Sequence, residues 1–467
     1  MSITRFVPAV LAVLGVGIVL GGATVLPPQQ PKPITSGEEV PTRVTSLCAV
    51  TDRESRTLDL TVGRAGQPTD GSLSVGNLGG DQSWDVTAGT AIADKITDGP
   101  ILLRAEGVSP IPHAGGLVSR TATGAGRGLA AQACTTPGAE HWLPGLSASG
   151  DHLSTVVISN PDPDAAEVDL QFWGAKGVVE APGSSGISIP PNGSRTVFLE
   201  GMVTEQGPIT ARVRATAGRV SVVADEQFRS GADARGADWM APAAAPATTQ
   251  VIPGILPGSG DRTLALVNPG DRTTTVRVEA LGVDGAFGPV GADRVDLPPQ
   301  STVQLPLAAA LKGEDVSLRL TADRAFTAGL VATSQAGGQA QDVARPVATA
   351  PLPTTGVATV RTDGATSTVM VANPGQQPAD VTVLARAVNG DEVSNDTLSL
   401  APGVARTFEV DTPAAFVEIT SAATELHAAV GVTSTANRVA GLAWLPVTPT
   451  SAATGAGQVW HDPPLGR

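Results

Sequence analysis

Apolar and polar residues alternate with a period of two along most of the chain. The segment 168–172 is typical, because it reads Val-Asp-Leu-Gln-Phe. In an extended strand this spacing places the apolar side chains on one face, whereas a helix needs apolar residues three or four positions apart. The pattern predicts short β-strands with one buried face. Beyond the N-terminal segment, it predicts a helix only at Leu307–Lys312.

The strands belong to a sequence repeat of about 105 residues. In three copies a strand ends in Asn-Pro, at Asn160, Asn268 and Asn373, which lie 108 and 105 residues apart. A second strand follows, and then a hairpin turn with a glycine in every copy: Gly177, Gly285 and Gly390. Asp-Gly and Asn-Gly pairs suit two-residue hairpin loops, which require positive φ angles. A fourth, divergent copy precedes these three, since Gly99–Arg104 matches Gly207–Arg212 at the same spacing.

About seven short strands in each copy are typical of an immunoglobulin-like β-sandwich. The Cys…Trp…Cys spacing of antibody domains is absent, so the expectation concerns the two-sheet architecture alone. We therefore expect an all-β chain with four tandem sandwiches at 42–140, 141–248, 249–350 and 351–450, and a flexible tail at 451–467. Ala/Pro/Thr-rich linkers at Ala241–Thr249 and Val347–Thr355 predict a rod-like array.

The N-terminal segment predicts export from the cytoplasm. Val7–Leu26 is twenty residues without a charge, enough to span a bilayer as one transmembrane helix. The preceding stub, 1–6, carries Arg5 and should stay cytoplasmic, so the body would lie outside, behind a Pro-rich spacer at 27–41. The alternative is a cleaved signal peptide and a secreted protein, with cleavage near Gly21–Ala23.

Composition narrows the function classes. The chain has 30 basic and 44 acidic residues and a net charge of −14, which argues against nucleic-acid binding. Cys48 and Cys134 are its only cysteines, and in an exported protein two cysteines most simply form one structural disulfide. A redox or metal pair would need a tight Cys-x-x-Cys or further ligands, and neither occurs.

Motifs for chemistry are scarce. The five histidines show no metal-ligand spacing, and the sequence has neither a Gly-x-Ser-x-Gly elbow nor a Walker A loop. Asp151, His152 and Ser154 lie together, but neighbours along one strand point to opposite faces and form no triad by themselves. We therefore expect no enzymatic activity, no cofactor and no metal; calcium bound through Asp162–Asp164 or Asp261 is the weaker alternative.

Two further motifs have competing interpretations. Leu352–Gly356 spells LPTTG, the sortase pattern, but 111 residues follow it without a hydrophobic and basic tail, so we interpret it as coincidence. Trp142, Trp239 and Trp444 lie at the boundaries of the copies. They either pack in the seams between copies or form exposed platforms on which a glycan stacks.

The segments RGLAAQACTTPGAEHWLPG at Arg127 and GADWMAPAAAP at Gly236, with the NPGD-type strand ends, carry a family resemblance. Together with the N-terminal span they resemble an uncharacterised actinobacterial family of membrane-anchored or secreted proteins, a domain of unknown function. The resemblance implies a location at the cell envelope and transfers no catalytic residue. We expect a non-enzymatic, membrane-anchored stalk that presents binding surfaces to a protein partner. The alternative is an accessory protein that binds cell-wall glycan.

Overall fold

The computed structural model divides the chain into two units, 1–40 and 41–467. It describes residues 42–449, apart from 50–57, 67–70, 82, 98, 108–110, 206, 336–341, 353, 362, 424 and 436–439. The predicted stub, span and spacer (1–41) and the predicted tail (451–467) lie outside the described residues. Within the described part of the chain, no helix has the length and apolar character needed to cross a bilayer.

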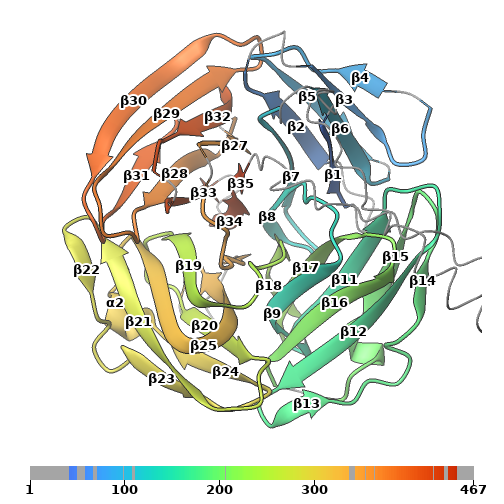
Figure 1. Ribbon diagram of the computed structural model, residues 1–467, viewed down its shortest axis with the longest axis vertical. Coiled ribbons are helices and arrows are strands. Elements are labelled where there is room, and N and C mark those ends of the chain that lie inside the picture. Colours follow the sequence, from blue (N-terminus) through green and yellow to red (C-terminus); the bar gives the residue numbers. More distant parts are fainter. Residues whose placement is uncertain are drawn as a thin grey trace, which may run out of the picture. The chain divides into compact units, whose positions relative to one another are not determined.

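The regular secondary structure of the described residues is almost entirely β-strand, which confirms the expected all-β class. The strands fall into four successive groups, which we call repeats 1 to 4 (Figure 1). Repeat 1 contains β1 (Thr42–Cys48), β2 (Leu58–Arg64), β3 (Ser72–Asn77), β4 (Ser83–Asp85), β5 (Ala91–Ile96), β6 (Ile101–Gly107), β7 (His113–Thr121) and β8 (Gly128–Ala133). Repeat 2 contains β9 (Glu140–Leu146), β10 (Ala148–Ser149), β11 (His152–Asn160), β12 (Ala166–Gly174), β13 (Gly177–Val179), β14 (Ile187–Ile189), β15 (Gly193–Phe198), the 3-10 turn η3 (Leu199–Gly201), β16 (Ile209–Ala217), β17 (Ser221–Ser230) and β18 (Asp233–Met240).

Repeats 3 and 4 follow the same order. Repeat 3 contains β19 (Ala247–Ile255), β20 (Arg262–Asn268), β21 (Thr274–Gly282), β22 (Gly285–Phe287), β23 (Arg294–Leu297), β24 (Ser301–Pro306), α2 (Ala308–Leu311), β25 (Val316–Thr333) and β26 (Val343–Ala344). Repeat 4 contains β27 (Thr355–Thr359), β28 (Thr366–Ala372), β29 (Ala379–Ala387), β30 (Glu392–Leu400), β31 (Ala405–Glu409), β32 (Ala414–Thr420), β33 (His427–Ser434), β34 (Gly441–Pro446) and β35 (Thr448–Pro449). The short helix α2 lies where the sequence predicts one.

Each repeat has two antiparallel sheets. The first sheets are ordered β1-β6-β3-β4, β9-β16-β12-β13, β19-β25-β21-β22 and β27-β32-β29-β30; the second sheets are β5-β2-β7-β8, β15-β11-β17-β18, β24-β20-β25-β26 and β31-β28-β33-β34. In repeat 3 the 18-residue strand β25 belongs to both sheets. The two-sheet part of the expectation therefore agrees with the structure. The strand order of immunoglobulin domains, A-B-E-D with C-F-G, is not found among the described strands.

Burial along the strands follows the sequence pattern. In β12, Val168, Leu170 and Phe172 are buried while Asp169 and Gln171 are partly exposed. The hairpin turns differ from the prediction in one respect. Gly177 and Gly285, which have positive φ, pair with Gly174 and Gly282 directly after the two-residue loops. The loop residues 175–176 and 283–284 do not have positive φ, so these loops are not the type I′ turns that require it at both central positions.

The recurring Asn-Pro motif has a structural cause. The side-chain amide of Asn268 donates hydrogen bonds to the carbonyl oxygens of Arg272 and Leu297, at 2.8 and 3.2 Å, and its Oδ1 accepts one from the N–H of Gly270. Asn160 and Asn373 make the same three bonds to the equivalent residues of repeats 2 and 4. Since all three side chains are buried, each amide holds together two loops of its own repeat.

The hairpin of one repeat lies against the later turn of the neighbouring repeat. The hairpins that follow β3, β12 and β21 each touch a turn of the next repeat, and the hairpin that follows β29 of repeat 4 touches repeat 1 in the same way. The paired residues are Gly79 with Asn192, Gly177 with Gln300, Ala286 with Gly403, and Gly390 with Gly89. In every pair the turn residue has positive φ. The four repeats therefore form a closed cycle of contacts, which ends where it begins.

Packing between repeats follows the same cycle. The first sheet of each repeat packs against the second sheet of the next. Val157, Val223 and Trp239 of repeat 2 join the apolar cluster of repeat 1, and Trp142 of repeat 2 packs on Val267 of repeat 3. Trp444 of repeat 4 donates a hydrogen bond from its indole nitrogen to a carbonyl of repeat 3, that of Pro253, at 3.0 Å.

The last link joins repeat 4 to repeat 1. Phe416 lies so close to Gly63 that a Cβ added to the glycine would be 2.5 Å from the ring. Arg361 forms an ion pair with Asp59 at 3.0 Å. In addition, the last strands of the four repeats (β8, β18, β26 and β34) contact one another in the same cyclic order.

The predicted rod-like array is therefore wrong. The linkers do not act as spacers, because Ala241, Ala243, Val347 and Ala348 are buried and the N–H of Ala244 donates to the carbonyl of Ala348. Their small side chains allow two linkers to approach closely. The Ala/Pro/Thr-rich composition, which is typical of a stiff spacer, occurs here where two extended linkers pack against each other.

Candidate functional site

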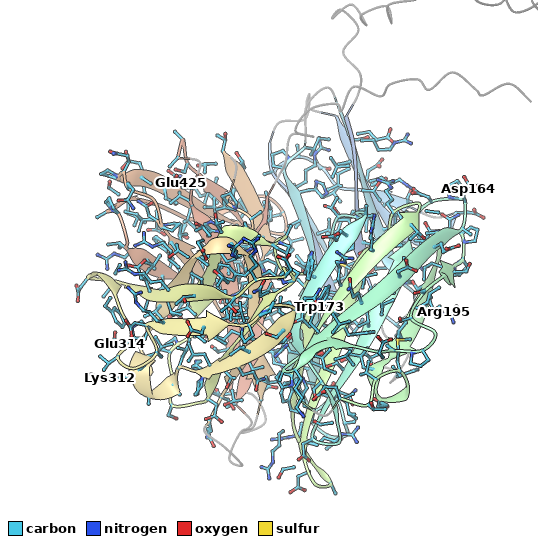
Figure 2. All side chains as sticks on the ribbon, turned by 60° about the horizontal axis from the view of Figure 1, so that its bottom comes forward. Asp164, Trp173, Arg195, Lys312, Glu314 and Glu425 are labelled. Carbon is cyan, nitrogen blue, oxygen red and sulfur yellow. A yellow bond between two sulfur atoms is a disulfide. The ribbon has the colours of Figure 1, made fainter. Side chains whose placement is uncertain are left out.

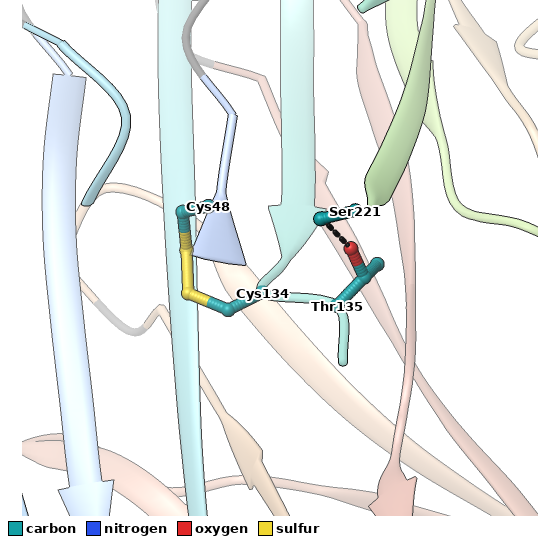
Figure 3. The surroundings of a disulfide bond; sticks show 4 residues. All are labelled: Cys48, Cys134, Thr135 and Ser221. Carbon is teal, nitrogen blue, oxygen red and sulfur yellow. Dashed lines mark hydrogen bonds between the residues drawn. A yellow bond between two sulfur atoms is a disulfide. The ribbon is translucent and has the colours of Figure 1, made fainter. Parts of the chain in front are cut away.

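The predicted disulfide is present. Cys48 at the end of β1 is bonded to Cys134, which follows β8, so the bond joins the two sheets of repeat 1 (Figure 3). Next to it, the Thr135 and Ser221 hydroxyls form a hydrogen bond between repeats 1 and 2. Both cysteines are buried. The described residues hold no free cysteine.

The three boundary tryptophans are not exposed. Trp142, Trp239 and Trp444 are 2%, 3% and 2% exposed. Trp142 stacks on Trp173 with ring centroids 5.1 Å apart, and the guanidinium of Arg212 lies over both rings. A buried indole offers no face to a sugar, so the glycan-platform interpretation of these residues is wrong in this structure. They pack in the seams, as the alternative interpretation expected.

The neighbouring Asp151, His152 and Ser154 do not assemble a triad. The imidazole Nε2 of His152 lies 2.6 Å from the carboxylate of Glu226, while the hydroxyl of Ser154 accepts a hydrogen bond from the N–H of Ser147. Ser154 is fully buried, so its hydroxyl cannot reach a substrate. The His152–Glu226 pair leads into a buried ionic cluster instead.

That cluster centres on Arg345, whose side chain is fully buried in the seam between repeats 2 and 3. Its Nε lies 3.6 Å from the carboxylate of Glu226, and its Nη2 donates to the carbonyl of Gly145 at 3.0 Å. Burial raises the pKa of Glu226, but Arg345 and His152 outweigh it and hold the pKa below its usual value. Burial also lowers the pKa of Arg345. Because the side chains of Arg345 and Glu226 are both fully buried, their ion pair has a structural role and is not accessible to a substrate.

A second buried carboxylate lies among the four last strands. Oδ2 of Asp342 accepts hydrogen bonds from the N–H groups of Leu129 on β8 and Leu442 on β34, each at 2.8 Å. Gly236 on β18 packs so closely on Asp342 that a Cβ added to the glycine would lie 2.6 Å from the α-carbon of Asp342. Burial raises the pKa of Asp342 well above its usual value, although these backbone amides lower it. Asp342 thus ties three repeats to its own.

A surface cleft of about 760 Å³ lies between repeats 3 and 4, and we call it the 3–4 cleft. This volume lies within the range of ligand-binding pockets. One wall is the outer face of the first sheet of repeat 3, with Arg277 and Glu279 on β21 and Arg319 on β25. The other wall includes Glu425 and His427 of repeat 4, and small apolar residues of the linkers complete the lining.

Charges in the 3–4 cleft are ordered. The carboxylate of Glu279 binds Arg277 and Arg319 at once, each at 3.0 Å. Arg319 also donates to the carbonyl of Pro374 at 2.6 Å, which fixes the guanidinium across the seam. Burial lowers the pKa of His427 to about 4, so its ring is neutral at pH 7 and contributes a polar but uncharged edge. The cleft therefore offers paired charges and neutral polar groups beside apolar walls.

Comparison between repeats explains why this seam is open. On the ladder of the first sheet, Gln171, Arg212 and Trp142 of repeat 2 occupy the same positions as Glu279, Arg319 and Val251 of repeat 3. In the seam between repeats 2 and 3 the Trp142 indole and its partner Trp173 fill the space, and Figure 2 shows Trp173 where the green and yellow strands meet. Val251 is much smaller than an indole, and the cleft lies at that place.

The sequence analysis missed the cleft residues. Part of the signal was present, because the spacing of 108 residues places Glu279 at the position of Gln171. The equivalence of Val251 and Trp142 comes from the strand register. That signal has meaning only once the structure shows that these positions face a neighbouring repeat.

Other predicted sites carry no ligand geometry. The carboxylate of Asp162 is held by two hydrogen bonds from Arg219, both 2.9 Å, and is not open to a cation. No group of three or more His, Cys, Asp or Glu side chains suited to a metal ion occurs among the described residues. In the LPTTG segment, Thr355 and Gly356 already belong to β27 and pair with β32.

A model of a known protein family matches most of the chain. The model of a family of unknown function, DUF5719, matches residues 91–413. The matched range begins at β5 and ends just before β32, so it includes all of repeats 2 and 3 and parts of repeats 1 and 4. No curated protein matches the chain.

Proposed function

Since the chain belongs to DUF5719, a family of unknown function, we propose its role from its structure. The protein is a non-enzymatic binding protein of the cell envelope, and it holds an extended segment of a protein partner in the 3–4 cleft. The observation that carries this proposal is the cleft itself, a pocket of about 760 Å³ in a seam whose counterpart between repeats 2 and 3 is filled by two tryptophans.

The disulfide supports a location outside the cytoplasm. Structural disulfides persist in oxidising compartments and are rare where glutathione and thioredoxin keep thiols reduced. The Cys48–Cys134 bond is therefore the expected feature of an exported protein. Anchoring by Val7–Leu26, with the body outside the membrane, remains part of the proposal and rests on the sequence alone.

The chemistry of the cleft favours a peptide segment. Its alanine and proline walls suit aliphatic side chains, while the Arg277–Glu279–Arg319 group and the neutral His427 offer donors and acceptors to a peptide backbone. The exposed carboxylate of Glu425 stands at the rim. Positive and negative groups are balanced here, so the cleft selects neither a strongly acidic nor a strongly basic segment.

The glycan-binding alternative loses its main support, because the three indoles on which it rested are buried. Support for a non-enzymatic role comes from the polar groups within reach of the cleft. Both of its arginines are paired with Glu279. The hydroxyl of Thr349 lies 2.9 Å from the His427 imidazole, but a buried imidazole whose pKa is about 4 is a weak general base near pH 7.

Site-specific photocrosslinking tests the proposal. A photoreactive residue replaces Glu425 at the rim of the cleft, or Asp164, an exposed residue of repeat 2 that serves as the control position; both are labelled in Figure 2. We expect a discrete crosslinked partner from position 425 in intact cells and none of the same mass from position 164. The partner is then identified by mass spectrometry.

A filled cleft provides the decisive variant. Val251→Trp places an indole at the position that Trp142 occupies in repeat 2. We expect this variant to fold with an unchanged thermal midpoint and to lose the crosslink at position 425. If the crosslink persists with Val251→Trp folded, or forms equally from position 164, the cleft is not the binding site.

A further inference from the structure

A second pocket, of about 550 Å³, lies between the hairpin that joins β7 to β8 and the hairpin that joins β17 to β18. Three arginines line it: Arg127, Arg229 and Arg235. Asp233 is the one carboxylate among its lining residues, and the remainder are glycines and alanines. It shares no lining residue with the 3–4 cleft, so an inference about it is independent of the proposed function.

The arginines project from a fixed backbone. Nη1 of Arg127 donates to the carbonyl of Ala234 at 3.0 Å, which ties the two hairpins together. Arg127 and Arg235 are equivalent positions 108 residues apart, each directly before a glycine that packs on Asp342. Arg229 pairs with Ala234 across the second hairpin. The pocket is thus assembled from rigid elements rather than from a long loop.

The charge in this pocket is not balanced. Elsewhere the partly buried arginines Arg219, Arg319 and Arg386 each bind a carboxylate at 2.9 to 3.0 Å. Three arginines and one carboxylate line this pocket. Arg229 donates to the side-chain oxygen of Gln227 at 3.3 Å, and Arg235 lies 3.5 Å from Asp233, whose side chain is 78% exposed. An ion pair so exposed is weak. The result is a concentration of positive charge on a protein whose net charge is −14.

We propose that this pocket binds the phosphate or carboxylate group of a small molecule. Guanidinium groups present parallel N–H donors that match the oxygens of phosphate and carboxylate, and such charge-assisted bonds are among the strongest hydrogen bonds in proteins. The volume exceeds the need of a bare oxyanion and leaves room for a body of the size of one sugar ring. The small glycine and alanine side chains leave the guanidinium groups accessible to it.

Isothermal titration calorimetry on the full chain tests this assignment. The probes are inorganic phosphate, glucose 6-phosphate, glucuronate and uncharged glucose, at about 20 mM and about 200 mM NaCl, because screening weakens exposed charge interactions at the higher salt. We expect the charged probes to bind and glucose not to bind. Binding of glucose 6-phosphate but not of glucuronate identifies phosphate as the recognised group, and the reverse identifies carboxylate.

Matched variants localise the binding. Arg229→Gln with Arg235→Gln removes two positive charges from the pocket, and Arg195→Gln with Arg294→Gln removes two from exposed strand positions elsewhere. We expect at least ~10-fold weaker binding in the first pair and no change in the second, with both folded by circular dichroism. The proposal is overturned if no charged probe binds at low salt, if glucose binds equally well, or if both pairs retain wild-type affinity.

Discussion

The carboxylate of Asp342 accepts a hydrogen bond from the backbone N–H of Leu129, at 2.8 Å and across 213 residues of sequence. The same oxygen accepts the N–H of Leu442 from repeat 4. The first and last strands at the centre of the cycle are therefore joined by a side chain of repeat 3. Two of the other last strands supply a glycine that packs on Asp342, Gly128 of β8 and Gly236 of β18.

Removing the Asp342 carboxylate should destabilise the whole cycle. Asp342→Ala leaves two buried N–H groups without an acceptor, which costs about 2–5 kcal/mol of unfolding free energy. Asp342→Asn keeps an acceptor oxygen and resembles the protonated acid that the raised pKa favours, so its cost should be much smaller. Denaturant unfolding of the three proteins measures the difference. Equal losses in Ala and Asn would contradict the assigned hydrogen bonds.

The buried imidazole of His427 should make the protein sensitive to acid. Its pKa is about 4 in the folded protein and 6.5 when unperturbed, so between these values the unfolded chain binds more protons than the folded one. Stability therefore falls as the pH falls through this window, by about 2.5 kcal/mol at pH 4.5 from this one group. Above pH 6.5 the effect is absent.

His427→Gln removes this titration and keeps a polar group for Thr349, which lies 2.9 Å from the imidazole nitrogen. We expect the drop in unfolding free energy between pH 7 and pH 4.5 to be smaller in the variant than in the wild type, by about the same 2.5 kcal/mol. Unfolding curves at the two pH values measure it. An identical drop in both proteins would show that His427 does not titrate in this window.

The buried asparagine of the repeat should resist even an isosteric change. Asn268→Asp preserves the shape and the accepting oxygen but loses the two hydrogen bonds donated to Arg272 and Leu297, and it places a carboxylate against two carbonyl oxygens. We expect a loss of at least ~2 kcal/mol. Asn395→Asp, on the exposed face of β30, is the control and should change stability by less than ~0.5 kcal/mol. Thermal and denaturant melts compare the two, and equal effects would argue against a structural role for the motif.

Local features of the fold were predictable from the sequence, whereas the relation between repeats was not. Period-two alternation places Val168 and Leu170 inside because the strand geometry alone decides which face they occupy. The disulfide was predictable because the chain has two cysteines and its N-terminal segment predicts export. Strand order and cycle closure depend instead on contacts between residues hundreds of positions apart, such as Arg361 and Asp59, and no local pattern records them.

The candidate sites were the least predictable part. Arg345 and Asp342 are ionisable residues in the interior, and a prediction that places ionisable side chains on the surface puts both outside. The tryptophans attracted a functional interpretation because of their position at repeat boundaries. In a closed cycle the boundary between two repeats is a buried seam, so a tryptophan at that position packs between the repeats. The 3–4 cleft is open because Val251 stands where repeat 2 has the larger Trp142, and no sequence motif marks a position by its small side chain.

Closure of the cycle can be tested at its last contact. Gly63 of repeat 1 has ordinary backbone angles, so Gly63→Ala carries no conformational strain, but its Cβ would lie 2.5 Å from the ring of Phe416 in repeat 4. We expect Gly63→Ala to lose about 1–3 kcal/mol through overpacking. Gly150→Ala, where an added Cβ meets no atom within 4 Å, is the matched control and should be nearly neutral.

A double-mutant cycle with Phe416→Ala separates this contact from a local effect. Phe416→Ala alone should cost about 3–5 kcal/mol, because it leaves a cavity in a buried cluster. In the double variant the alanine methyl no longer meets the ring. The double variant should therefore lose less unfolding free energy than the two single variants together, with a coupling of about 1–3 kcal/mol. Strict additivity would mean that Gly63 and Phe416 do not touch in solution. Closure of the cycle would then depend on the other contacts between repeats 4 and 1, such as the ion pair of Arg361 with Asp59.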